Sequence, residues 1–145
     1  MRKDIQEYLT EATDLSAIGH RLVEFLRCLK SQGNPKIGYV AGMITSEGPE
    51  FVERNLLRLE KYTQQISKKY HFPVFSQNDI FTPEVYQLIK ASGVTREEFE
   101  EFYRQVHGSG LITHLFMTPR WELSRGATDE LNTAVMANLT IIYIE

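Results

Sequence analysis

Residues 37–44 read Ile-Gly-Tyr-Val-Ala-Gly-Met-Ile, and the turn-forming residues 45–48, Thr-Ser-Glu-Gly, follow directly. So short an apolar run predicts a buried β-strand rather than a helix. Pro49 then suits the first turn of a helix, and apolar residues recur at helical spacing up to about residue 70. The stretch therefore predicts a strand, a loop and a helix, which is the repeating unit of α/β proteins.

The rest of the chain repeats this alternation. Further short apolar runs predict strands at residues 72–75, 111–117 and 139–144. Helical patterns lie between them at residues 83–91, 95–106 and 124–136. The polar residues 76–79 are expected to form a loop. Apolar strands that alternate with helices predict an α/β, flavodoxin- or Rossmann-like three-layer sandwich, with a mostly parallel sheet of about four or five strands.

Residues 1–34 are predicted to form a helical extension to an α/β domain of residues 35–145. Apolar residues at three- and four-residue steps predict a helix at about 14–30, with Asp14 as its N-cap. A second short helix near residues 4–11 has a weaker pattern. The apolar stripe of the extension is expected to pack on the domain or on a partner subunit.

Composition narrows the classes of partner. The 145 residues include 16 basic and 19 acidic side chains, so a nucleic-acid polymer is not an expected partner. Cys28 is the single cysteine and the four histidines are scattered, so neither a disulfide nor a metal site is predicted. The apolar runs are too short for membrane spans and the N-terminus is polar, which favours a cytoplasmic location without membrane contact.

Residues 118–131 read Thr-Pro-Arg-Trp-Glu-Leu-Ser-Arg-Gly-Ala-Thr-Asp-Glu-Leu, between the third predicted strand and the next helix. Together with Val-Ala-Gly-Met-Ile at residues 40–44, this segment resembles the nucleoside 2-deoxyribosyltransferase-like superfamily. Bacterial and phage members of that superfamily carry a Pro-Gly-Trp-Glu-x-Ser-x-Gly-Ala-x-x-Glu pattern. The resemblance covers about residues 37–144.

The resemblance implies a role for three residues of this segment. Glu130 matches the glutamate that acts as nucleophile in the family. Ser124 matches a serine that relatives hydrolysing nucleoside 5′-monophosphates carry, where transferases acting on free nucleosides have an aspartate. Gly126 matches a glycine that lets the backbone approach the ligand. Apart from the resemblance, Ser124 has the residue type of a helix N-cap, and Glu130 that of an exposed helix acid.

The loop after the first strand is a second candidate for ligand binding. Gly42, Ile44 and Ser46 precede a predicted helix N-terminus, whose N–H groups can receive a phosphate. The loop has neither the P-loop sequence nor the dinucleotide-binding glycine pattern, so an ordinary strand-to-helix turn is the alternative.

The base or sugar side of the site is assigned to Tyr103, Gln105 and Trp121. Gln105 aligns with a family aspartate, and glutamine cannot move a proton. Trp121 is either a core ring at the end of the sheet or a wall of the pocket. Arg120 stands where the family pattern has glycine.

The expected function is an N-glycosidase that hydrolyses the base–sugar bond of a nucleoside 5′-monophosphate. A carboxylate can stabilise the oxocarbenium-like transition state or form a glycosyl intermediate, and no cofactor is needed. One alternative is a non-catalytic nucleotide-binding or protein-interaction module, which Gln105 favours. Another is a nucleoside 2-deoxyribosyltransferase. The resemblance also implies a homodimer or a larger homo-oligomer.

Overall fold

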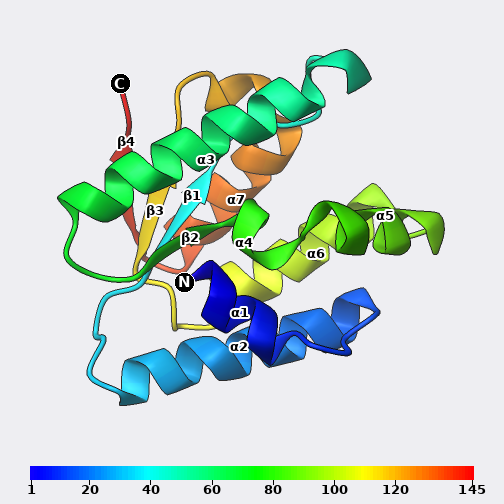
Figure 1. Ribbon diagram of the computed structural model, residues 1–145. Helices are drawn as coiled ribbons and strands as arrows, with labels where there is room; N and C mark the ends of the chain where they lie inside the picture. The colour runs from blue at the N-terminus through cyan, green and yellow to red at the C-terminus, as the bar shows by residue number, and fades with distance from the viewer.

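The computed structural model describes residues 1–145 and confirms the α/β fold (Figure 1). The strands are β1 (Gly38–Ala41), β2 (Val74–Ser76), β3 (His114–Met117) and β4 (Thr140–Tyr143). The helices are α1 (Arg2–Tyr8), α2 (Leu15–Ser31), α3 (Val52–Lys69), α4 (Gln77–Ile80), α5 (Pro83–Ala91), α6 (Arg96–His107) and α7 (Arg125–Met136). Single 3-10 turns, Pro49–Phe51 and Trp121–Leu123, precede α3 and α7.

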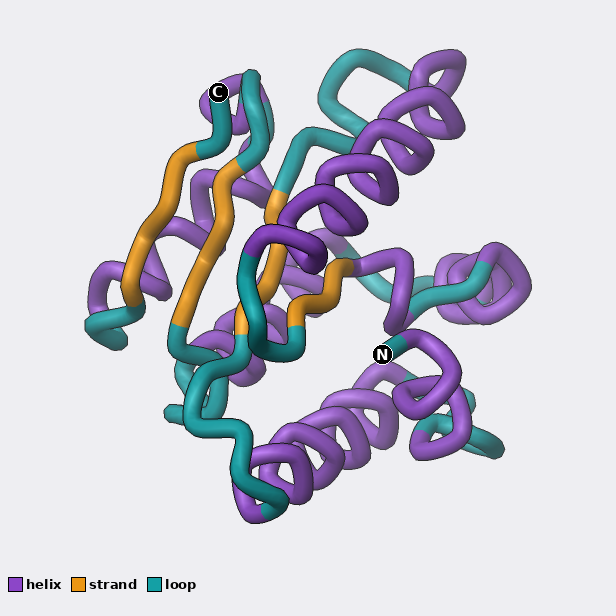
Figure 2. The backbone as a smooth tube through the Cα atoms, turned by 60° about the vertical axis from the view of Figure 1, so that its left-hand side comes forward, coloured by secondary structure: helices purple, strands orange, loops and turns teal.

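The four strands form one parallel sheet in the order β2-β1-β3-β4 (Figure 2). Side chains alternate between its faces. On one face Val40 and Phe116 pack with Leu59 of α3. On the other face Tyr39 and Leu115 belong to the larger part of the core, which α6 and α7 complete. The prediction of a three-layer sandwich is confirmed.

The N-terminal helices share this larger core. Ile5, Ile18, Leu22 and Leu26 have no exposed surface and join the same cluster as the sheet residues. Helix α1 packs on α4, and α2 packs on α6 (Figure 1). The apolar stripe of residues 1–34 was expected to pack either on the domain or on a partner subunit. In the structure it packs on the domain. None of the helices combines the length and the apolar character that a membrane span requires.

The predicted polar loop at residues 76–79 is wrong. Ser76 ends β2, and the helix α4 begins directly after it. Asn78 N–H donates to Ser76 Oγ at 3.3 Å, and Ser76 N–H donates to Asp79 Oδ2 at 2.8 Å. These reciprocal bonds satisfy two N–H groups at the start of the helix, so a single turn can form without an apolar stripe.

Candidate active site

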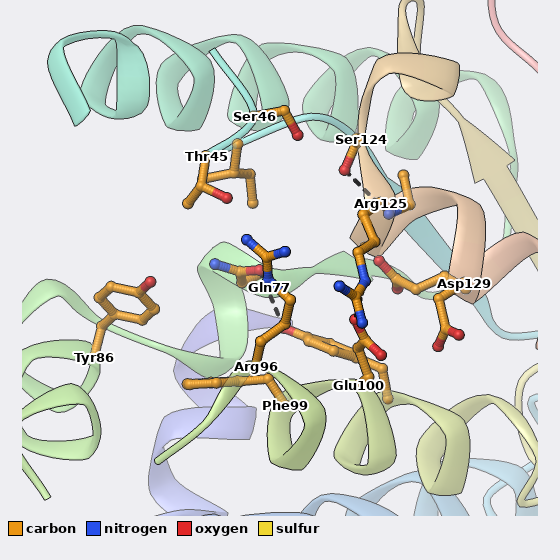
Figure 3. A pocket seen from close by; sticks show the side chains of 16 residues that line it. Thr45, Ser46, Gln77, Tyr86, Arg96, Phe99, Glu100, Ser124, Arg125 and Asp129 are labelled. Carbon is orange, nitrogen blue, oxygen red and sulfur yellow. Dashed lines mark hydrogen bonds and ion pairs between the residues drawn. The ribbon is translucent and has the colours of Figure 1, made fainter. Parts of the chain in front are cut away.

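A cavity of about 350 Å³ lies at the carboxyl ends of the strands, where parallel α/β sheets usually bind ligands (Figure 3). The loop after β1 lies on one side of it, α5 and α6 on another, and the N-terminal turns of α7 close a third. The residues that line it are Gly42, Ile44, Thr45, Ser46, Gln77, Tyr86, Arg96, Phe99, Glu100, Tyr103, Ser124, Arg125, Gly126, Ala127, Asp129 and Glu130. This volume is at the lower end of the range for small-molecule sites.

Most of the residues singled out from the sequence meet in this cavity, although they come from separate segments. Those that line it are Gly42, Ile44, Ser46, Tyr103, Ser124, Gly126 and Glu130. Gln105 and Trp121 do not line it.

Gln105 is exposed on another face of α6. The α6 residues that line the cavity, Arg96, Phe99, Glu100 and Tyr103, follow the three- and four-residue spacing of one helix face. Gln105 comes two residues after Tyr103, about 200° further around the helix. The structure therefore does not bring this glutamine to the base or sugar side of the site.

Trp121 lies half-buried beside β4, the edge strand of the sheet. Its ring centroid is 5.8 Å from that of Tyr143 on β4, and its ring packs against the larger core. Trp121 was expected to be either a core ring or a wall of the pocket, and these contacts are those of a core ring.

The first turn of α7 presents polar groups to the cavity. Ser124 is buried and is the N-cap, its Oγ accepting from Ala127 N–H at 3.1 Å. The N–H groups of Arg125 and Gly126 have no acceptor inside the helix. A Cβ at Gly126 would come no closer than 3.8 Å to another group, so the backbone is open there. This end of α7 is suited to an anion.

The loop after β1 is held in place by contacts at both of its ends. Thr118 Oγ1 donates to Ala41 O at 3.0 Å, and Gly42 leaves the space that this close approach requires. Asn55, buried on α3, donates through Nδ2 to Ile44 O at 2.9 Å. Ser46 lies beyond these contacts and is exposed at the rim of the cavity.

Glu130 is 9% exposed and faces the cavity from the second turn of α7. Its Oε2 lies 2.6 Å from Nε2 of His107, while Oε1 makes no hydrogen bond within the chain. His107 is the last residue of α6 and has no exposed surface. This histidine was not predicted from the sequence, although it lies four residues after Tyr103 on the same face of α6.

Two tyrosine rings surround His107. Its ring centroid lies 4.7 Å from that of Tyr39 on β1 and 6.0 Å from that of Tyr103. Burial, followed by the charge of Glu130, raises the pKa of both phenols well above the usual value for tyrosine. Both therefore keep their protons at neutral pH, and Tyr103 O–H donates to Gln77 Oε1 at 3.2 Å.

Most of the charges around the cavity are paired. Arg125 extends from α7 to Glu100 on α6, with Nε 2.9 Å from Oε1 (Figure 3). Arg104 contacts the other oxygen of Glu100 at 3.5 Å and Asp129 at 2.8 Å. Arg96 forms no ion pair and is exposed at the rim, so one cation is free to meet an anionic ligand.

The acidic and histidine side chains form no group of three or more that could hold a metal ion. Comparison of the chain with protein-family models, with curated proteins and with solved structures found no match. The resemblance to nucleoside 2-deoxyribosyltransferase-like proteins rests on the sequence motifs alone. The function is therefore argued from the geometry of the cavity.

Proposed function

We propose that the protein is an N-glycosidase that hydrolyses the base–sugar bond of a nucleoside 5′-monophosphate. One observation carries this proposal: Glu130 and the N-terminus of α7, with its cap Ser124, line the same cavity. Glu130 follows the cap by six positions, which corresponds to about 9 Å along the helix axis. One helix thus offers an anion-binding end and a carboxylate to the two ends of a single small ligand.

The phosphate end of the ligand is assigned to α7 and the β1 loop. The free N–H groups at Arg125 and Gly126 and the positive end of the helix dipole favour a dianion. Ser46 and the unpaired Arg96 add a hydroxyl and a cation at the rim. An aspartate at Ser124 would instead repel a phosphate, which agrees with the preference expected for the serine.

The sugar then lies with its anomeric carbon above Glu130. Oε1 has no hydrogen-bond partner within the chain, so it can attack C1′ as the base leaves with the electrons of the glycosidic bond. The base takes up a proton from water in the open cavity. A water molecule next attacks C1′ of the glycosyl ester and gives its proton to the hydroxide left when the base was protonated, which releases the sugar phosphate and restores the carboxylate.

Release of free base from a panel of ribo- and deoxyribonucleoside 5′-monophosphates tests this function, with binding measured on the same samples. We expect Glu130→Ala to lose base release and to keep most of its binding. Ser124→Asp is expected to lose monophosphate binding, because it adds a charge at the phosphate position. Tight binding without release by the unmodified protein would contradict hydrolysis and favour a non-catalytic nucleotide-binding module. Release only when a second free base is present would favour deoxyribosyl transfer.

A further inference from the structure

The contact between His107 and Glu130 has no counterpart elsewhere in the chain. No other histidine contacts a carboxylate, and His107 is fully buried where α6 ends. Only one of its two ring nitrogens has a partner: Nε2 meets Glu130 Oε2 at 2.6 Å, whereas Nδ1 is buried without any hydrogen bond. This difference between the two nitrogens indicates which of them carries the proton of the ring.

Three arrangements of protons would fit the 2.6 Å contact. A doubly protonated ring, or a neutral ring that accepts a proton from Glu130, would bury an N–H at Nδ1 with no acceptor. Buried N–H groups without partners are rare in folded proteins. A neutral ring with its proton on Nε2 leaves only a lone pair at Nδ1 and donates its N–H to the carboxylate. The groups that face the ring, Tyr39 from β1, Tyr103 from α6 and Glu130 from α7, supply no acceptor for Nδ1.

We propose that His107 is a positioning residue for Glu130, a role that rests on the proposed function. Its Nε2–H donates to Oε2 and fixes the plane of the carboxylate, so that Oε1 is the oxygen presented to the anomeric carbon. The flanking tyrosine rings hold the imidazole in turn. Orientation of a reacting group by a buried partner matters because a misplacement of about 1 Å can cost about 10²-fold in rate.

NMR of the 145-residue chain, labelled with ¹⁵N in histidine, tests the proton assignment independently of enzymatic activity. We expect the His107 ring to show a protonated Nε2 and a bare Nδ1 at neutral pH, because only Nε2 has a partner. Glutamine substitutions at His20, His71 and His114 assign its signals by elimination. A protonated Nδ1 in this spectrum would overturn the proposal.

Two variants test the positioning role in catalysis. His107→Gln keeps an N–H donor near Oε2, whereas His107→Phe keeps a ring without a donor. With the preferred monophosphate we expect kcat to fall by about 10²-fold in the phenylalanine variant, with KM changed less than about threefold, and by less than about tenfold in the glutamine variant. Equal losses in two folded variants would contradict a donor role. Absence of base release from the unmodified protein would overturn the proposed function, and the NMR result would still decide whether His107 donates to Glu130.

Discussion

Arg120 holds a backbone conformation that few residues of its type adopt. Its φ of 69° and ψ of 17° place it in the left-handed region, at the start of the turn before α7. This is the position at which the resembled family carries glycine, the residue that enters that region without a steric cost. The ion pair of Arg120 with Glu47, at 3.4 Å, is solvent-exposed and stabilises the fold little.

Arg120→Gly is therefore expected to raise the free energy of unfolding by up to about 1 kcal/mol. The relief of about 1–2 kcal/mol of left-handed strain is partly offset by the larger entropy of glycine in the unfolded chain. Asn138→Gly is the control, because asparagine tolerates its φ of 61° better and should gain less. Urea unfolding measures both changes. A lower stability for Arg120→Gly would contradict this account of the turn.

At the scale of elements, the N-terminus of α7 has a structural task and a proposed binding task. Ser124→Ala removes the cap of α7 and should lower the free energy of unfolding by about 1 kcal/mol. Thr95→Ala is the matched control, because Thr95 caps α6 through the same kind of bond and does not line the cavity. Both variants should lose similar stability by urea unfolding, and only Ser124→Ala should lose monophosphate affinity by calorimetry. An equal loss of affinity in both would contradict the assigned phosphate position.

Asp79 joins three elements. Asp79 belongs to α4, and its Oδ2 accepts a hydrogen bond from Ser76 N–H at the end of β2. Its Oδ1 forms an ion pair with Nε of Arg2, on α1, at 3.0 Å. Burial is the largest influence on this carboxyl, and it raises the pKa of Asp79 above the usual 3.8.

Asp79 should therefore give stability a distinct dependence on pH. Because the folded state binds the proton more tightly, the free energy of unfolding falls as pH rises from 3.8 through the raised pKa, and stays lower above it. The amount by which the free energy of unfolding of the unmodified protein exceeds that of Asp79→Asn is expected to shrink with rising pH over this window. Urea titrations at several values between about pH 4 and 7 measure it. A difference that is constant, or that grows with pH, would contradict the direction of the shift.

Strands and longer helices were predictable because their apolar spacing is set locally. Residues 14–30 and 95–106 match α2 and α6 to within one or two residues. Helix α4 was missed because a single turn has no periodicity and depends on the capping bonds of Ser76. In the site, the α7 residues were predictable from the motif. Gln105 was assigned to the site by an alignment that did not consider which face of the helix it lies on. The partner of Glu130 depends on how α6 packs against α7, which no local pattern reports.

At the scale of the whole molecule, the N-terminal helices and the sheet share one core. Leu22 of α2 has no exposed surface and lies in the same cluster as Leu115 of β3. A destabilising mutation in the core of α2 should therefore lower the stability of the whole chain. If residues 1–34 were instead a separable extension, its helices would unfold alone.

Leu22→Ala is expected to lower the free energy of unfolding by about 2–5 kcal/mol, because it leaves a cavity in the core. Trp121, the one tryptophan, reports on the rest of the domain by fluorescence, and circular dichroism reports on all helices. Both signals should shift together, while exposed His20→Ala on the same helix changes stability by less than about 0.5 kcal/mol. A fluorescence transition that does not move in Leu22→Ala would contradict the shared core.

The proposed hydrolysis depends on Glu130 as its nucleophile. Initial rates of base release by Glu130→Gln and Asp129→Asn test it most directly, because the two carboxylates are neighbours on α7 and line the same cavity. We expect Glu130→Gln to lose on the order of 10³-fold or more in kcat, because the nucleophile is gone. Asp129→Asn should stay within about tenfold of the unmodified protein. Base release that survives in Glu130→Gln would contradict the proposed role of Glu130 as the nucleophile.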